Sequence, residues 1–203
     1  MNANLPSPWL SMLEEIRSIA QLGLHYATGD HFDQARYRRL LELASFAYAG
    51  LAELPAESVL QRFQSELGHV TPKVGVNGAI FNEAGQILLL QRRDDQCWSL
   101  PAGWCDMNET PREALVREIH EELNLTAEAG NVVEIFTRKP GEWASPHTAY
   151  LILLQAKLLG GTPRCHPDEV LDWGWFNPEA ELNWHRDHQS FARRARDYRL
   201  QHG

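Results

Sequence analysis

Hydrophobic and polar positions follow two different patterns along the chain. From residue 1 to about 68, the apolar side chains recur every three or four positions, which is the spacing of an amphipathic helix. The pattern predicts a first helix that starts at Ser7-Pro8, a second from about Asp33, and a third over 56–67 that Gly68 caps. We therefore expect a helical N-terminal domain over residues 1–68.

From Lys73 onward the pattern changes to short apolar runs separated by turn residues, which is typical of strands. Helices are expected over 111–123 and, at the end of the chain, over 178–200. Strands and helices intermixed in this way predict a second, α/β domain over 69–203, with helices on both faces of a sheet. The predicted strands cover 74–81, 87–93, 97–104, 132–138, 149–159 and 172–176.

The composition is that of an ordinary soluble protein. Hydrophobic residues make up 43% and charged residues 23% of the 203 positions, so a core can form without disulfides or a structural metal. The longest apolar runs are too short for a membrane helix, and the first residues lack a signal-type segment, so a cytoplasmic location is expected. The net charge of −8 argues against DNA, RNA and membrane surfaces as partners.

Acidic residues are concentrated between positions 109 and 122. Glu118, Glu121 and Glu122 stand at i, i+3 and i+4, so on a helix they project from one face. Two like charges about 4 Å apart repel by roughly 4 kcal/mol near a protein surface. Such a cluster either raises the pKa values of its carboxyl groups or binds a cation. Because Mg²⁺ and Mn²⁺ prefer oxygen ligands and also bind phosphate, the pattern predicts a divalent-metal site for a phosphorylated substrate.

Signals at both ends of this acidic segment define its helix. Thr110 is suited to the N-cap, Pro111 to the first helical position, and Glu113 to closing a capping box with Thr110. The helix is expected to end near Leu123, because Asn124 accepts the left-handed conformation that ends helices.

The same residues carry a family resemblance. Gly103, Glu109 and the run "REIHEE" over 117–122 stand at the spacing of the Nudix box, GX5EX7REUXEEXGU, in which U is a bulky apolar residue. The chain thus resembles the Nudix hydrolases, although Asn124 stands where the family has glycine. The resemblance implies an α/β/α sandwich with a mixed sheet, and metal-dependent attack of water on a diphosphate.

The resemblance extends to the N-terminal segment. "IRSIAQLGLHYATGDHFDQARYRRLLELA" and "TPKVGVNGAIFNEAGQILLLQRR" are similar to a subfamily that acts on nucleoside diphosphates linked to X, including CDP-choline pyrophosphatases. This implies CDP-choline as the first substrate and ADP-ribose as the second, with nucleoside triphosphates and RNA ends behind them. The identity of X stays open, because the segment "NPEAELNWHRDHQS" after the last strand stands where the subfamily has a Leu-Pro and Leu-Ser pattern.

The resemblance also assigns roles within the box. Glu118 and Glu122 are the first choices as direct ligands of Mg²⁺ or Mn²⁺, together with the backbone carbonyl of Ala102, and Glu121 is expected to bind the metal directly or through water. Gly103 is expected to be structural, and so are Arg117 and Glu109, as an ion pair that holds the loop against the helix.

Water activation requires a group that reaches the attacking water. The family often supplies another acid in the loop before the last strand, which here reads "HPDEVLDW". Glu169 is preferred over Asp168 and Asp172, with an exposed loop acid as the open alternative. Glu121 and Glu169 are therefore the expected catalytic residues.

Arginines and tryptophans near strand ends are candidates for substrate binding. Arg92 and Arg93 end one strand, so alternation directs one of them toward the site and the other toward solvent. Arg138 ends another strand, where a plain surface charge is the commoner role. Trp98 and Trp143 are candidates for stacking on a base.

Two further groups of residues have open roles. His185 and His188 stand three positions apart with no third metal ligand, so a solvated helix face is expected. The helical domain has an additional apolar face, which would either pack on the second domain or form a two-fold dimer. The subfamily resemblance favours the homodimer, in which the helical domain would also contribute to the substrate site. This face comprises Tyr37, Phe46, Tyr48, Leu51 and Leu54.

One alternative belongs to another functional class. Some Nudix folds bind a nucleotide as regulators without hydrolysing it. Such proteins usually lose carboxylates of the box, whereas this chain keeps all of them. Hydrolysis is therefore the favoured function.

Overall fold

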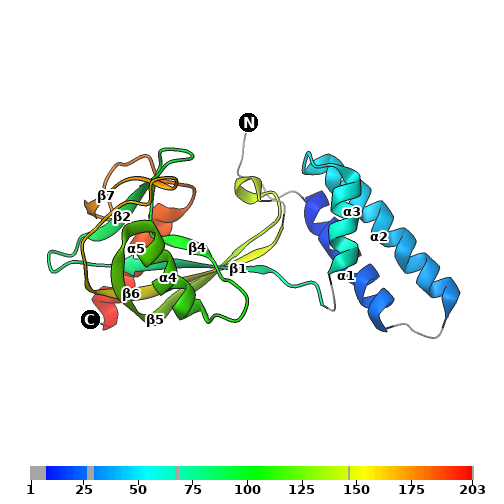
Figure 1. Ribbon diagram of the computed structural model, residues 1–203, viewed down its shortest axis with the longest axis horizontal. Helices are drawn as coiled ribbons and strands as arrows, with labels where there is room; N and C mark the ends of the chain where they lie inside the picture. The colour runs from blue at the N-terminus through cyan, green and yellow to red at the C-terminus, as the bar shows by residue number, and fades with distance from the viewer. Residues whose placement is uncertain (1–7, 27–29, 67–68, 146, 203) are drawn as a thin grey trace. The chain divides into compact units, whose positions relative to one another are not determined.

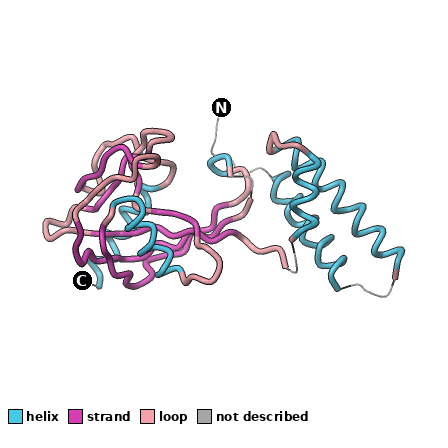
Figure 2. Tube along the Cα trace, in the orientation of Figure 1, coloured by secondary structure: helices cyan, strands magenta, loops and turns pink. Residues whose placement is uncertain are grey.

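The computed structural model describes residues 8–26, 30–66, 69–145 and 147–202, so the expected helix-end residues Ser7 and Gly68 lie outside the described residues. The chain forms two compact units. The first runs to Lys73 and also contains Arg138–Ala149, and the second contains Val74–Thr137 and the chain from Tyr150 onward. Figure 1 follows the chain by residue number, and Figure 2 shows that one unit is mainly helical and the other rich in strands.

The first unit contains α1 (Pro8–Tyr26), α2 (His31–Leu51) and α3 (Ala56–Ser65). The side chain of Asp30 caps α2 by accepting a hydrogen bond from the amide of Phe32. Segment 138–149, which the sequence placed with the second domain, joins this unit because Thr148 donates from its amide and hydroxyl to the Glu14 carboxylate. The core of the unit includes Leu10, Leu13, Leu41, Ala44, Tyr48, Val59 and Phe63.

The expected additional apolar face of the helical unit is only partly correct. Tyr48 is buried and its ring packs against Phe63 at 5.4 Å between centroids. Tyr37 packs so closely against Gly23 that a β-carbon there would lie 2.5 Å from its ring. Tyr48 therefore belongs to the interior of this unit, and Tyr37 is half-buried. Phe46, Leu51 and Leu54 are exposed as expected, and Phe32, Leu40 and Leu43 are exposed on α2 as well.

The strands of the second unit form two sheets. A four-stranded sheet has the order β4-β1-β6-β5, and a three-stranded sheet has the order β3-β2-β7. The α/β class is as expected, but the single sheet is replaced by two. The strand bounds are β1 Lys73–Ile80, β2 Ile87–Arg92, β3 Trp98–Ser99, β4 Ala102–Trp104, β5 Leu125–Arg138, β6 Ala149–Gly161 and β7 Val170–Phe176.

The expected strand over 97–104 is divided between the two sheets. Ser99 pairs with Leu90 of β2, whereas Ala102 pairs with Asn77 of β1. The chain crosses between them at Leu100 and Pro101, because proline cannot donate the amide hydrogen bond that a continuous ladder needs. This crossing brings β4 beside the acidic helix.

That helix is α4 (Pro111–Leu123), and it begins and ends as predicted. Thr110 and Glu113 form the capping box, and Asn124 adopts the left-handed conformation with φ 55°. The helix packs onto the sheets through Leu115, Ile119 and Leu123, which are fully buried among apolar residues of both sheets. Burying each such side chain stabilises the fold by about 1.5–3 kcal/mol. Glu118 and Glu122 lie on an adjacent side of the helix, where they meet the backbone of β4.

The last helix, α5 (His188–His202), is shorter than expected. Residues 178–187 form turns and an isolated bridge in which Trp184 runs parallel to Trp98. His185 and His188 are buried, so the expectation of a solvated histidine face was wrong. No helix in the described part of the chain is long and apolar enough to cross a membrane.

Candidate active site

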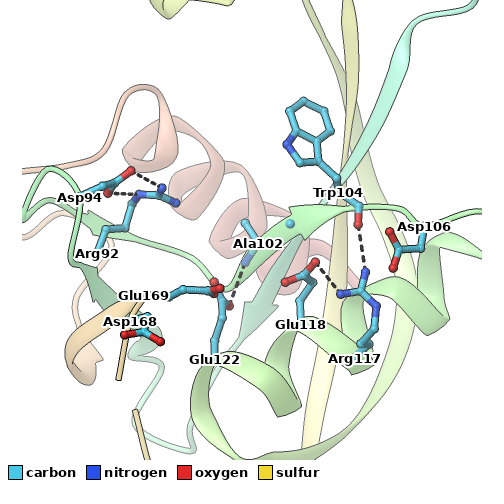
Figure 3. Close-up of a pocket in the computed structure, with 11 residues that line it drawn as sticks. Arg92, Asp94, Ala102, Trp104, Asp106, Arg117, Glu118, Glu122, Asp168 and Glu169 are labelled. Carbon is cyan, nitrogen blue, oxygen red and sulfur yellow. Dashed lines mark hydrogen bonds and ion pairs between the residues drawn. The ribbon is translucent and has the colours of Figure 1, made fainter. Parts of the chain in front are cut away.

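A pocket of about 440 Å³ lies in the second unit where α4, β4 and two loops meet. Figure 3 shows Glu169, Glu122 and Glu118 between Arg92 and Arg117, with Asp94 beside Arg92. The pocket is lined by Arg92, Asp94, Ala102, Gly103, Trp104, Asp106, Arg117, Glu118, Glu122, Asp168 and Glu169.

Glu122 is the most enclosed acid of the pocket, with 5% of its surface exposed. The amide of Ala102 donates to its Oε2 at 3.2 Å, which links α4 directly to β4. Burial raises the pKa of Glu122 well above its usual range, and the neighbouring Glu118 and Glu169 raise it further. A buried acid that other acids surround is a position where a cation would be stabilising.

Glu118 lies against the backbone of β4. A β-carbon on Gly103 would stand 1.9 Å from Glu118 Oε1, so only glycine leaves room for this carboxylate. Burial raises the pKa of Glu118, whereas its hydrogen bond and charge contact with Arg117 oppose that rise. The distance from Arg117 Nη1 to Glu118 Oε1 is 2.9 Å.

Arg117 connects the loop to the helix, as expected. Its guanidinium binds Glu109 at 2.7 Å and donates from Nη2 to the carbonyl of Trp104 at 3.0 Å. It also binds Glu121 Oε2 at 2.9 Å. The hydrogen bond with Glu109 is the largest cause of the raised pKa of Arg117. Glu121 is half-exposed and is not among the described residues that line the pocket, although it shares Arg117 Nη1 with Glu118.

The loop before β7 brings Glu169 to these acids. The amides of Arg164 and His166 donate to the last carbonyls of α4, at Leu123 and Glu122, both at 2.9 Å. Free carbonyls at a helix C-terminus are strong acceptors, so they hold this loop in place. Asp168 and Glu169 both line the pocket, whereas Asp172 lies on β7 away from it.

Strand alternation separates the two arginines at the end of β2. Arg92 lines the pocket and binds the Asp94 carboxylate through Nε at 3.0 Å and Nη2 at 2.6 Å. Hydrogen bonding with Arg92 lowers the pKa of Asp94 to about 2. Arg93 is absent from the pocket lining in the described chain, and its amide donates to the carbonyl of Glu169 at 2.8 Å.

Three other expected substrate contacts do not line this pocket. Trp98 packs against Phe176, with 4.5 Å between ring centroids. Arg138 is buried and Trp143 half-buried, and both belong to the first unit. The sequence reasoning missed Asp94, Trp104 and Asp106. Trp104 and Asp106 directly follow Gly103, so their place beside the box was the available signal.

The donor chemistry of the pocket fits a divalent cation. Its described lining contains six carboxylates and two arginines, an excess of negative charge that would repel a diphosphate. Oxygen donors of this kind suit Mg²⁺ or Mn²⁺. Yet no group of three or more His, Cys, Asp or Glu side chains among the described residues is arranged to hold a metal ion. Glu118 is bound to Arg117, so its carboxylate would have to turn toward an ion.

Family models match both parts of the chain. One described as the NUDIX domain matches residues 71–195. A second, described as a UDP-X-like, N-terminal oligomerisation domain, matches residues 7–63. The two matches follow the division between the helical and the strand-rich regions.

Individual relatives include hydrolases. The chain is 34% identical over 154 residues to the putative ADP-ribose pyrophosphatase YjhB of Bacillus subtilis, which is 75% of this chain and 73% of that protein. An ADP-ribose pyrophosphatase from Streptococcus suis superposes with a TM-score of 0.54 at 26% identity, over 66% of this chain and 94% of that one. A UDP-X diphosphatase structure has a TM-score of 0.59 at 21% identity and covers 96% of this chain and 95% of its own, which shows a shared fold.

Proposed function

The chain belongs to the Nudix family of hydrolases, and from that premise we propose that it splits the diphosphate linkage of a nucleoside diphosphate linked to X. The products would be a nucleoside monophosphate and a phosphorylated X. The observation that carries the proposal is the pocket in which Glu118, Glu122 and Glu169 converge beside Arg92. This pairing suits a cation-bound anionic substrate.

The choice of X rests on the relatives. YjhB is named a putative ADP-ribose pyrophosphatase, and the model that matches residues 7–63 is described as UDP-X-like. We therefore place ADP-ribose and UDP-linked compounds first among the substrates to be tested. CDP-choline stays a prediction from the sequence, since nothing in the pocket singles out choline.

Several residues of the pocket have a proposed part in the reaction. The Arg92 guanidinium binds a phosphate of the substrate and orients the linkage. Glu118, Glu122 and the Ala102 carbonyl would hold Mg²⁺ or Mn²⁺, which would supply neutralisation of the charge on phosphate and activation of water. Glu169 accepts the proton of the attacking water, and Arg117 keeps Glu118 beside Gly103.

Product analysis tests the proposal directly. Purified protein is incubated with Mg²⁺ or Mn²⁺ and ADP-ribose, UDP-sugars, CDP-choline, NADH, dinucleoside polyphosphates or nucleoside triphosphates. We expect one diphosphate class to yield a monophosphate, with turnover lost after chelation of the metal. Glu122→Gln serves as the inactive control. Turnover that survives in Glu122→Gln, or in excess chelator, contradicts the proposed site.

The same experiment separates hydrolysis from regulation. A regulator would bind a nucleotide tightly and turn over no member of the panel. The intact set of pocket carboxylates favours the enzyme.

We also propose that the protein is a homodimer through its helical region. The match to an oligomerisation domain supports this, and so do the exposed apolar side chains of α2. Leu40, Leu43, Phe46 and Leu51 are exposed along α2, outside the side that carries its buried residues, and a second copy would remove them from water.

A further inference from the structure

Two buried histidines stand where the chain enters α5. His185 and His188 are 7% and 5% exposed, and their rings meet edge to face with centroids 5.2 Å apart. His188 Nδ1 accepts a hydrogen bond from the amide of Leu100 at 3.1 Å, at the crossing between β3 and β4. The amide of His185 donates to the carbonyl of Trp98 at 2.8 Å. This segment thus contacts the chain at Trp98 and Leu100, shortly before the pocket residue Ala102.

The side chain of His185 contacts the turn that follows β2. Its Nδ1 forms a charge-assisted hydrogen bond with Asp95 Oδ2. The other oxygen, Asp95 Oδ1, accepts from the amide of Cys97 at 3.0 Å. Asp95 is therefore held on both sides, by its own turn and by the start of α5.

The same turn carries the pocket arginine. Arg92 donates its amide to the carbonyl of Cys97 at 2.9 Å, and its carbonyl accepts from the amide of Gln96 at 3.1 Å. Its guanidinium is bound on one edge by Asp94, the neighbour of Asp95. Gln96 has a positive φ of 60°, a conformation that is costly for a residue with a side chain. Such a turn persists where surrounding contacts hold it.

We propose that the Asp95–His185 hydrogen bond positions Arg92 for the substrate diphosphate. The bond fixes the turn over 92–97 against the segment that leads into α5. This turn then fixes the position of Asp94 and the plane of the Arg92 guanidinium. His185 and Asp95 are positioning residues, since neither lines the described pocket. This inference rests on the proposed function, in which Arg92 binds a phosphate.

Four variants separate the hydrogen bond from the volume of the ring. His185→Leu removes the donor, and Asp95→Ala removes the acceptor from a partly exposed position, so it is the less disruptive change. His185→Asn retains a donor close to Nδ1. His202→Leu is the matched control, because His202 is exposed on the same helix. We expect His185→Leu and Asp95→Ala to raise KM by ~10-fold, the effect of one charge-assisted hydrogen bond, with kcat changed less than threefold.

Combining each variant with Arg92→Ala distinguishes a role in positioning Arg92 from a general loss of stability. If His185 acts through Arg92, adding His185→Leu or Asp95→Ala to Arg92→Ala raises KM no further. His185→Asn is expected to recover most of the wild-type KM, and His202→Leu to leave it unchanged. A KM increase that is as large in the Arg92→Ala background as in the wild type overturns the proposal.

Hydrogen exchange provides a readout that does not depend on turnover. Amides in 92–98 are expected to exchange faster in His185→Leu and Asp95→Ala than in the wild type and His202→Leu. If the wild type hydrolyses no substrate, the proposed function fails, and the exchange result alone decides whether the bond orders the turn. Unchanged exchange in both variants overturns the inference even if the enzyme is active.

Discussion

Gly103 and Glu118 are in such close contact that the glycine leaves no space for a β-carbon, which would stand 1.9 Å from Glu118 Oε1. The glycine belongs to β4 and the glutamate to α4, so the approach of strand and helix depends on the missing side chain. Because the near atom is the end of a flexible side chain, a substitution would displace the carboxylate more than the backbone.

Gly103→Ala is therefore expected to damage the site more than the fold. Displacing Glu118 from its position should lower kcat/KM by at least ~100-fold, the scale of losing one stabilising group in a transition state. The melting temperature should fall by only a few degrees, about what ~1 kcal/mol of strain produces. Gly160→Ala is the matched control, since a β-carbon at Gly160 meets nothing within 4 Å. Normal activity in Gly103→Ala would mean that Glu118 has no catalytic part.

Glu122→Gln and Glu121→Gln are expected to behave differently. Glu122 is buried in the pocket, whereas Glu121 is half-exposed and bound to Arg117. We expect Glu122→Gln to reduce kcat by ~100-fold or more and Glu121→Gln by less than ~10-fold. Steady-state kinetics at saturating Mg²⁺ makes the comparison. Equal losses would restore Glu121 to the direct role that the sequence assigned to it.

Without added metal, Glu122→Gln should also be more resistant to heat than the wild type. Its carboxylate is buried near Glu118 and Glu169, so a neutral side chain of the same shape removes a repulsion. The amide of Ala102 keeps its acceptor in this variant. Thermal unfolding in chelator measures the effect, and a lower melting temperature would contradict this account of the site.

His147 should make the first unit sensitive to acid. Burial lowers its pKa to about 4, with further lowering by the nearby charges of Lys73, Arg17 and Arg62. The folded state thus resists a proton that the unfolded chain binds near pH 6.5, so stability is full above pH 6.5 and falls as the pH drops toward 4. We expect a loss of roughly 1–2 kcal/mol, less than the full pKa shift implies because the ring is not fully buried.

The matched comparison is His147→Gln against His202→Gln, with urea unfolding at pH 7.5 and at pH 4.5. His147→Gln should lose less stability between the two pH values than the wild type does. His202→Gln should follow the wild type. Identical pH dependence in all three proteins would show that His147 is not the group responsible.

The exposed face of α2 should control the oligomeric state. Phe46 is 73% and Leu43 50% exposed, and both lie on the apolar side of the helix. A charge buried at a two-fold interface meets its own copy and is strongly unfavourable, so Phe46→Glu and Leu43→Glu should yield monomers. Sedimentation equilibrium measures the mass. Glu128→Gln, at an exposed position of β5 in the second unit, should leave the mass unchanged.

The sequence predicted the acidic helix to within a residue. Thr110, Glu113 and Asn124 are local signals, because a capping box and a left-handed C-terminal residue involve only neighbours along the chain. The spacing of Gly103, Glu109 and Arg117 likewise identified the loop and helix that form the pocket. Alternation along β2 predicted that Arg92 and Arg93 would differ, but only the structure showed that Arg92 faces the pocket.

The errors share a physical origin. Residues 97–104 look like one strand, yet Leu100 and Pro101 carry the chain from one sheet to the other. His185 and His188 look like a solvated pair, yet both are buried because the segment before α5 packs along β3. Neither outcome can be found from local periodicity, since each depends on a partner strand that is distant in the sequence.

By itself, then, the sequence determined the family, the α/β class, the helix that carries the carboxylates and the residues of its caps. These properties follow from side-chain spacing and from backbone preferences that act over a few positions. Only the tertiary structure decided that Asp94 and Trp104 line one pocket together with Glu118, Glu122 and Glu169. Those placements depend on packing between residues that are distant in the sequence, and this packing determines which side chains of each loop face α4.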